Sequence, residues 1–334
     1  MTRKELVQTS LKHKQPPTVP YQIGFTKVAH EKMAAFYGNP DFERDLGNCL
    51  NGIGTASAGA WTEVKAGFWR DQFGVVWDQT VDKDIGVPAN VLVTPANVDA
   101  FKFPDPDDPT RYAGSDRAIQ DHPDLYAVAN IGFSLYERAW TLAGMENILM
   151  AMVTDRPFVE RLLDRITEFN LRVIAHAVQH PIDGMMFGDD WGRQNGMIFG
   201  AQLWRELIKP RAARMYGAVK AAGKSVWIHS CGKVDEIYPD LIEIGLDVFN
   251  PFQPEVIDVF AIKRRFGKKL AFYGGISTQR TLPYGSPEDT RREVAILVEK
   301  IGKNGGYIAA PAHSIPADAL PENIAAMIDV LKNQ

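Results

Sequence analysis

The sequence SVWIHSCG, residues 225–232, decides how the rest of the chain is interpreted. Its apolar centre favours a β-strand, and its final glycine lets the chain turn directly afterwards. His229 and Cys231 are two positions apart, and because side chains alternate along a strand, both are expected to point the same way. An imidazole next to a thiol at the end of a strand indicates half of a zinc site. A buried cysteine beside a hydrogen-bonded histidine explains this stretch alone equally well.

Strand-like and helix-like segments alternate on both sides of this stretch. Short apolar segments typical of buried strands occur at residues 19–25, 125–130, 184–189, 248–250, 270–275 and 306–310, with helical patterns between them. Such alternation predicts right-handed βαβ units around a parallel sheet. About eight strand–helix units are found if a poorly defined second unit is included, and eight is the number that closes a barrel.

The chain before residue 125 is less regular. Residues 1–13 predict a leading amphipathic helix, residues 47–60 are rich in small residues and predict a loop, and residues 61–77 predict a hairpin. We therefore predict one α/β domain over residues 1–334. It is a single (β/α)8 TIM barrel formed by residues 19–334, with an N-terminal helical extension at residues 1–18.

Composition limits the possible functions. The chain has 334 residues, of which 45% are hydrophobic, and a net charge of −4, so nothing indicates a nucleic-acid partner. No apolar run is long enough for a membrane span, and the first residues lack the apolar core of a signal peptide. Two cysteines are too few for a disulfide framework, so a cytoplasmic protein is expected. The absence of a Gly-x-Gly-x-x-Gly or Walker-type loop after the first strand disfavours a nucleotide-binding open sheet.

A second histidine follows the last predicted strand. Chemistry in a TIM barrel sits at the carboxyl ends of the strands, so His313 is expected on the same rim as His229 and Cys231. Zinc accepts two imidazoles and one thiolate, and catalytic zinc keeps one position open. We predict that these three residues bind zinc; the simpler alternative is that His313 caps the last helix or bonds to the backbone. Glu137, after the third strand, is a possible fourth ligand, although an exposed first-turn glutamate explains it slightly better.

Further polar and aromatic residues are expected at this rim. Asp189 and Asp190 follow a strand, so one of them should face the barrel. Asp189 is our candidate for a general acid or base, a metal ligand or a partner that orients a histidine, and capping of a helix is an equally good explanation. The candidate substrate-binding residues are Tyr21, Gln22, Trp191, Asn250, Gln253 and Tyr273. For any one of the aromatic residues, packing in the core is the simpler explanation.

Several of these segments together resemble the uroporphyrinogen decarboxylase superfamily. The resemblance rests on KQPPTVP (residues 14–20), HSCG (229–232), APAH (310–313) and PENI (321–324), and it covers nearly the whole chain. It implies a (β/α)8 barrel with an N-terminal extension. The true decarboxylase carries an Arg-Gln-Ala-Gly-Arg signature after its first strand, which clamps substrate carboxylates. Residues 24–28 here read GFTKV, without an arginine, so decarboxylation of a tetrapyrrole is not expected.

One branch of this superfamily consists of zinc-dependent, corrinoid-linked methyltransferases. They use a His-x-Cys pair and a later cysteine just after the last strand. This sequence keeps the pair but has His313 at the later position, which is a departure from the members that transfer methyl groups to thiols. GDDWG (188–192) and NPFQPE (250–255) resemble the O-demethylase components that act on methoxylated aromatic compounds.

The resemblance to that branch implies a reaction and its partners. A methyl group would pass from a methoxylated aromatic compound, or a similar donor, to a corrinoid (cobalamin) carried by a partner protein. Zinc would act as the Lewis acid on the ether oxygen. Asp189 or Glu255, the candidate catalytic residues, would position a neighbouring hydroxyl of the substrate. A homodimer is expected by analogy alone.

Two other functions are compatible with the same residues. One is a metal-assisted lyase or decarboxylase of the superfamily that acts on a small organic acid. The other is a non-catalytic barrel that binds a corrinoid or a tetrapyrrole. The methyltransferase would need a corrinoid protein and remove a methyl group from its substrate, whereas the lyase would release CO2. Tight binding without any product would support the non-catalytic barrel.

Overall fold

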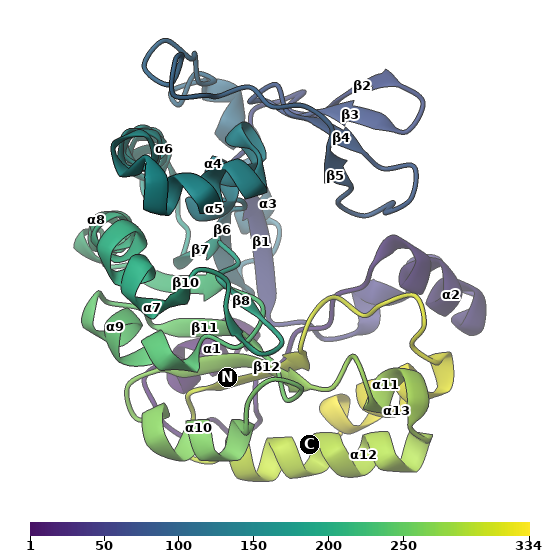
Figure 1. Cartoon of the computed structure of the whole chain (residues 1–334). Helices are drawn as coiled ribbons and strands as arrows, with labels where there is room; N and C mark the ends of the chain where they lie inside the picture. Colours follow the sequence, from purple (N-terminus) through teal and green to yellow (C-terminus); the bar gives the residue numbers. More distant parts are fainter.

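The computed structural model describes all 334 residues and is built on a seven-stranded parallel sheet. The strand order, β1-β6-β7-β10-β11-β12-β13, follows the sequence. The strands curve around a common interior, and the helices lie outside them (Figure 1). Their bounds are β1 (Leu50–Gly54), β6 (Tyr126–Ile131), β7 (Gly184–Gly188), β10 (Ser225–His229), β11 (Val248–Phe252), β12 (Ala271–Ile276) and β13 (Tyr307–Pro311).

Residues 20–25 take the place of the eighth strand. On one side the N–H of Gln22 donates to the carbonyl of Ala309 on β13, at 3.0 Å. On the other side the N–H of Cys49, just before β1, donates to the carbonyl of Tyr21, at 3.0 Å. Pro20 has no N–H to contribute, which is one reason why this stretch forms only isolated bridges. The predicted (β/α)8 TIM barrel is therefore confirmed, with one irregular strand.

Helices cover the outside of the sheet, and α1 (Arg3–Leu11) lies across its amino end, where Ser10 Oγ donates to the carbonyl of Tyr307 at 2.8 Å. No helix combines the length and the apolar character needed to cross a membrane. The outer helices are α2 (Lys27–Tyr37), α3 (Ser115–Gln120), α4 (Tyr136–Ala143), α5 (Met145–Thr154), α6 (Arg156–Ala177), α7 (Gly200–Leu203), α8 (Lys209–Ala221), α9 (Tyr238–Glu243), α10 (Val259–Phe266), α11 (Thr281–Tyr284), α12 (Pro287–Ile296) and α13 (Pro321–Lys332), with π-helical turns at Trp204–Ile208 and Leu297–Ile301.

Two expectations for the chain before residue 125 need correction. The loop predicted for residues 47–60 was wrong for residues 50–54, where β1 forms and pairs in parallel with β6 from Leu50 to Gly54. The predicted hairpin is part of a larger unit, a four-stranded antiparallel sheet of β2 (Thr62–Lys65), β3 (Phe68–Arg70), β4 (Val76–Asp78) and β5 (Val87–Pro88). This sheet stands apart from the barrel strands in Figure 1. A minor hairpin, β8 (Gly192–Arg193) and β9 (Gly196–Met197), follows β7.

The alternation of side chains along β10 sets the position of the site. Val226 and Ile228 point outward into the core between sheet and helices, whereas Trp227 points inward into a small cluster inside the barrel. His229 comes two residues after Trp227 and therefore also faces the interior. The barrel interior below it is filled by apolar side chains, which leaves the carboxyl end of the strands for chemistry.

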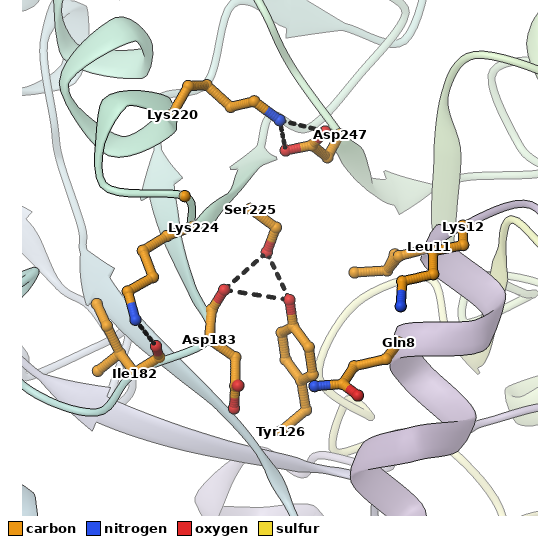
Figure 2. Close-up of a pocket in the computed structure, with 11 residues that line it drawn as sticks. Gln8, Leu11, Lys12, Tyr126, Ile182, Asp183, Lys220, Lys224, Ser225 and Asp247 are labelled. Carbon is orange, nitrogen blue, oxygen red and sulfur yellow. Dashed lines mark hydrogen bonds and ion pairs between the residues drawn. The ribbon is translucent and has the colours of Figure 1, made fainter.

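The amino ends of the strands carry a polar cavity of about 420 Å³, at the opposite end of the barrel (Figure 2). There the hydroxyl of Tyr126 bonds to Ser225 Oγ at 2.8 Å and to the carbonyl of Asp183 at 3.2 Å. Lys220 pairs with Asp247 at 2.8 Å. These groups satisfy one another, so this end of the barrel holds the structure together, as is usual for the fold.

Candidate metal centre

The three predicted zinc ligands converge at the carboxyl end of the barrel. His229 is the last residue of β10, Cys231 lies two residues beyond it, and His313 lies two residues beyond β13. The ligand atoms of all three lie within 4.8 Å of one another. Cys231 Sγ is 3.4 Å from His229 Nε2, and the two imidazole ring centres are 5.5 Å apart. Residues 84 positions apart in the sequence thus present two nitrogens and one sulfur to a single point.

Asn250 fixes the tautomer of His229, that is, which ring nitrogen carries the proton. The side-chain N–H of Asn250 donates to the carbonyl of Tyr273 at 2.9 Å, so its Oδ1 is left as an acceptor. This oxygen lies 2.6 Å from His229 Nδ1, which must therefore carry the proton. Nε2 then keeps its lone pair and points toward Cys231. A hydrogen bond of this kind is what orients histidine ligands in metal sites, and it makes Asn250 a positioning residue.

Asp190 is an acidic residue beside the cluster. Its Oδ1 accepts the backbone N–H of Cys231 at 2.8 Å and lies 4.0 Å from His229 Nε2. Burial raises the pKa of the Cys231 thiol, and the nearby charges of Asp190 and Glu137 raise it further. Partial burial and the neighbouring His229 lower the pKa of His313, which favours the neutral imidazole that a metal requires.

A cavity of about 320 Å³ opens beside the cluster. Its polar end is formed by His229, His313, Asp190 and Glu137, and its apolar wall by Ile85, Ile131, Phe133 and Met186. Ile85 comes from the loop between β4 and β5, so the antiparallel sheet contributes to the site. Burial, and then the charges of Asp190 and Asp189, raise the pKa of Glu137 well above its usual range. This raised pKa favours the protonated form of the carboxyl group that lines the cavity.

Asp189 faces the start of helix α4, and the buried Trp191 ring packs on Trp204 at 5.3 Å, so neither residue lines the cavity. The Asp189 carboxylate accepts the backbone N–H groups of Leu135, Tyr136 and Glu137 at 3.3, 3.1 and 2.7 Å, and the indole N–H of Trp191 at 2.5 Å. Burial raises the pKa of Asp189 to about 6, and these hydrogen bonds oppose the rise. A carboxylate that accepts the first N–H groups of a helix interacts favourably with the positive end of the helix dipole. Asp189 therefore caps helix α4, which was the alternative explanation considered for it.

Gln253 and Glu255 hold loops at the rim. Gln253 Oε1 accepts the N–H of Gly232 at 2.7 Å, which fixes the turn after Cys231. Glu255 Oε1 accepts the hydroxyl of Ser277 at 2.6 Å, and its other oxygen is buried without a partner. Glu255 is not among the residues that line the cavity beside the cluster.

The remaining predicted residues lie below or beside the site. The Tyr273 ring packs on Trp227 at 6.0 Å inside the barrel, so it supports the floor beneath Asn250. The Tyr21 hydroxyl donates to the carbonyl of Leu46 at 2.8 Å, and Gln22 Oε1 accepts the N–H of Leu50 at 3.0 Å. Both of these residues serve the closure of the barrel, and neither lines the cavity.

The donor set fits a zinc ion. One thiolate and two neutral imidazoles are ligands that zinc accepts, and three protein ligands leave a position open. The orientation of His229 by Asn250 is the outer contact that such sites carry. The sequence named Asp189 and Asp190 together but favoured Asp189, whereas Asp190 is the one beside the cluster. It did not predict Ile85 in the apolar wall, because that residue comes from a loop of a separate sheet.

Comparison with known proteins places this barrel in a family. The model of the family described as uroporphyrinogen decarboxylase (URO-D) matches residues 81–334, more than half of the chain, so the chain belongs to that family. The uroporphyrinogen decarboxylase of Chlorobaculum tepidum is 21% identical over 251 residues, which cover 72% of this chain and 69% of that protein. The Aliivibrio salmonicida enzyme of the same name is 25% identical over 259 residues, 71% of this chain and 68% of that protein.

A solved structure resembles the whole chain. It is described as a methyltransferase from Methanosarcina mazei, and it superposes with a TM-score of 0.75 over 100% of this chain and 99% of that one. Sequence identity is 16%, so the similarity establishes the fold that the two chains share.

Proposed function

We propose that this protein is a zinc-dependent methyltransferase that takes a methyl group from a methoxylated aromatic compound and passes it to a corrinoid carried by a partner protein. The observation that carries the proposal is the convergence of His229, Cys231 and His313 within 4.8 Å at the carboxyl end of the barrel. The similarity in fold to a protein named a methyltransferase supports it. Membership of the URO-D family supports an enzymatic function in general.

The chain itself supplies the environment for the reaction. The apolar wall of Ile85, Ile131, Phe133 and Met186 offers contacts to a flat ring. His229, Cys231 and His313 would hold the metal, and Asn250 keeps the lone pair of His229 Nε2 available for it. When bound, zinc supplies a Lewis acid for the ether oxygen, which makes a phenolate a better leaving group.

The transfer balances without a further reactant. The electron pair of a reduced corrinoid forms the new bond to the methyl carbon, and the electrons of the broken carbon–oxygen bond remain on the phenolate oxygen. Glu137 lines the same cavity, and its raised pKa suits it to deliver a proton to that oxygen. Alternatively its carboxylate is the fourth metal ligand, and substitution separates the two roles, as described below.

The test is an assay of the metal-loaded protein with a methoxybenzene derivative and a reduced corrinoid on its partner protein. We expect release of the corresponding phenol and methylation of cobalt, seen in the visible spectrum, with a stoichiometry of one to one. Both should stop when a chelator removes the metal. Phenol release that continues without metal, or no methyl transfer by a protein that holds metal, would contradict the proposal.

A metal-assisted decarboxylase is the second candidate, because the curated relatives are named uroporphyrinogen decarboxylase. It predicts CO2 release from an organic acid without any corrinoid. Tight binding of the corrinoid with neither product would instead support a binding protein. The same assay, extended to CO2, therefore separates the three functions.

A further inference from the structure

A second cavity, of about 270 Å³, lies next to the candidate metal centre. Residues 130–133, at the end of β6, line both cavities, so the two meet at one stretch of chain. The second cavity is also lined by Phe73 and Phe169, which present aromatic rings. Two arginines, Arg111 and Arg138, are among its lining residues, and no aspartate or glutamate is.

Arg111 is a buried cation without an ion-pair partner. Only 3% of its surface is exposed. Its guanidinium donates to the backbone carbonyls of Asp105 and Thr55 and to the side-chain oxygen of Gln72, at 2.7 to 3.1 Å. All of these acceptors are uncharged, and the surrounding aspartates act on its charge only from a distance. Burial of a charge without a paired countercharge costs free energy, and a bound anion would supply that countercharge.

Arg138 uses only part of its hydrogen-bonding capacity. It is 7% exposed, and its Nη1 donates to Asp71 at 2.9 Å and to Thr141 at 3.4 Å. Its Nε and Nη2 donate to no protein group. The guanidinium lies 4.0 Å from the ring centre of Phe73 and 5.6 Å from that of Phe133. It therefore faces the aromatic cavity with N–H groups to spare.

The charges of the residues that line this cavity do not balance. Arg111 and Arg138 bring two positive charges, and Asp71 is the single carboxylate bonded to either of them. A guanidinium has a planar fork of donors that matches a carboxylate, and such bonds are stronger than those between neutral groups. The rings of Phe73, Phe133 and Phe169 suit a flat ring attached to that carboxylate.

We propose that the Arg111–Arg138 cavity binds the carboxylate of an aromatic acid. This inference rests on the proposed function and deepens it, since it makes the methyl donor a methoxylated aromatic acid. The carboxylate would lie against the arginines, the ring would pass residues 130–133, and the methoxy group would reach the cavity beside the metal ligands. The Arg111–Arg138 cavity would thus select the class of methyl donor, and methyl transfer would take place in the cavity beside the metal ligands.

The test is calorimetric titration of the metal-loaded protein with 4-methoxybenzoate and with 4-methoxybenzamide, which differ in charge but hardly in shape. The wild type should bind the acid at least about tenfold more tightly than the amide, because charge-assisted bonds exceed neutral ones. Arg111→Gln should reduce this preference to less than about threefold, because the charged N–H donors of Arg111 are lost. Arg161→Gln is the matched control, since Arg161 lies on α6, half-exposed and 3.8 Å from Asp99, and does not line the cavity.

Arg138→Gln leaves the buried Asp71 without its ion-pair partner, so Arg111→Gln is the more informative variant. The acid–amide comparison on the wild type does not depend on any variant being folded. Equal affinity of the wild type for acid and amide would overturn the inference, and so would a preference that survives in Arg111→Gln. Displacement of the acid by inorganic phosphate at similar concentrations would also overturn it, because it would indicate a general anion site.

Failure of this inference can be told apart from failure of the proposed function. If the acid preference is present but no methyl group is transferred, the carboxylate site stands and the methyltransferase proposal falls. If neutral methoxybenzenes are demethylated as fast as the acids, and no acid preference exists, the methyltransferase stands and the carboxylate site falls.

Discussion

Replacement of Asn250 by leucine should weaken zinc binding without touching a ligand. The change removes the oxygen that lies 2.6 Å from His229 Nδ1 and accepts its proton. Leaving a buried donor without an acceptor costs about 1–3 kcal/mol. Loss of such an outer contact typically lowers metal affinity by roughly 10–100-fold, or about 1.4–2.7 kcal/mol. We therefore expect the zinc dissociation constant of Asn250→Leu to rise by about 10–100-fold.

The assay is competition for zinc against a chromophoric chelator of known affinity, at fixed pH. Asn250→Asp is the companion variant, because it keeps an oxygen acceptor at His229 Nδ1 and should stay within about tenfold of the wild type. Thermal unfolding of the metal-free proteins separates a folding defect from a loss of affinity. An unchanged dissociation constant in Asn250→Leu would refute the reasoning that this hydrogen bond sets the tautomer of His229.

Three further substitutions test other parts of the site. Glu137→Gln should retain zinc but lower the methyl-transfer rate by roughly 100-fold or more, since it removes a proton donor; loss of zinc instead would identify Glu137 as a ligand. Burial raises the pKa of Asp189 to about 6, so its contribution to stability is complete below the unfolded value near 4 and is lost as pH rises through 6. The stability of the wild type relative to Asp189→Asn should therefore fall by up to roughly 3 kcal/mol from pH 4 to pH 8, measured by urea unfolding, and a rise would contradict this. Gly232→Ala should cost at least about 2 kcal/mol and weaken zinc binding, because Gly232 has a φ of 85° and a Cβ there would lie 2.3 Å from the backbone of Gly192; wild-type stability would disprove the constraint.

Much of the fold could be predicted because parallel strands that are buried on both faces leave a simple apolar signature. β10 and β13 have that signature, and their ends carry His229 and His313. β1 does not, since Leu-Asn-Gly-Ile-Gly contains few strand-forming side chains. It is a strand because its backbone pairs with β6, a tertiary interaction that the local sequence does not contain. The four-stranded antiparallel sheet was recognised only in part, because its strands are short and separated by turns.

The site was predictable where strand alternation applies and not where it stops. His229 ends β10, so the same-face argument for His229 and Cys231 held closely enough to bring their atoms within 3.4 Å. β7 ends at Gly188, and the aspartates lie in the turn that follows it. Alternation could not tell which of Asp189 and Asp190 faces the cluster. The roles of Asn250 and Gln253 depend on groups from other segments that their side chains meet, which no local pattern records.

The most direct measurement is the metal content of the purified protein, by mass spectrometry, for the wild type and for Cys231→Ala and His313→Ala. We expect about one zinc per chain in the wild type and a loss of zinc in both variants. Cys49→Ala is the matched control, since Cys49 is buried inside the barrel, away from the cluster, and its loss should leave the zinc in place. A wild type without metal, or zinc retained in both Cys231→Ala and His313→Ala, would contradict the metal site on which the proposed function depends.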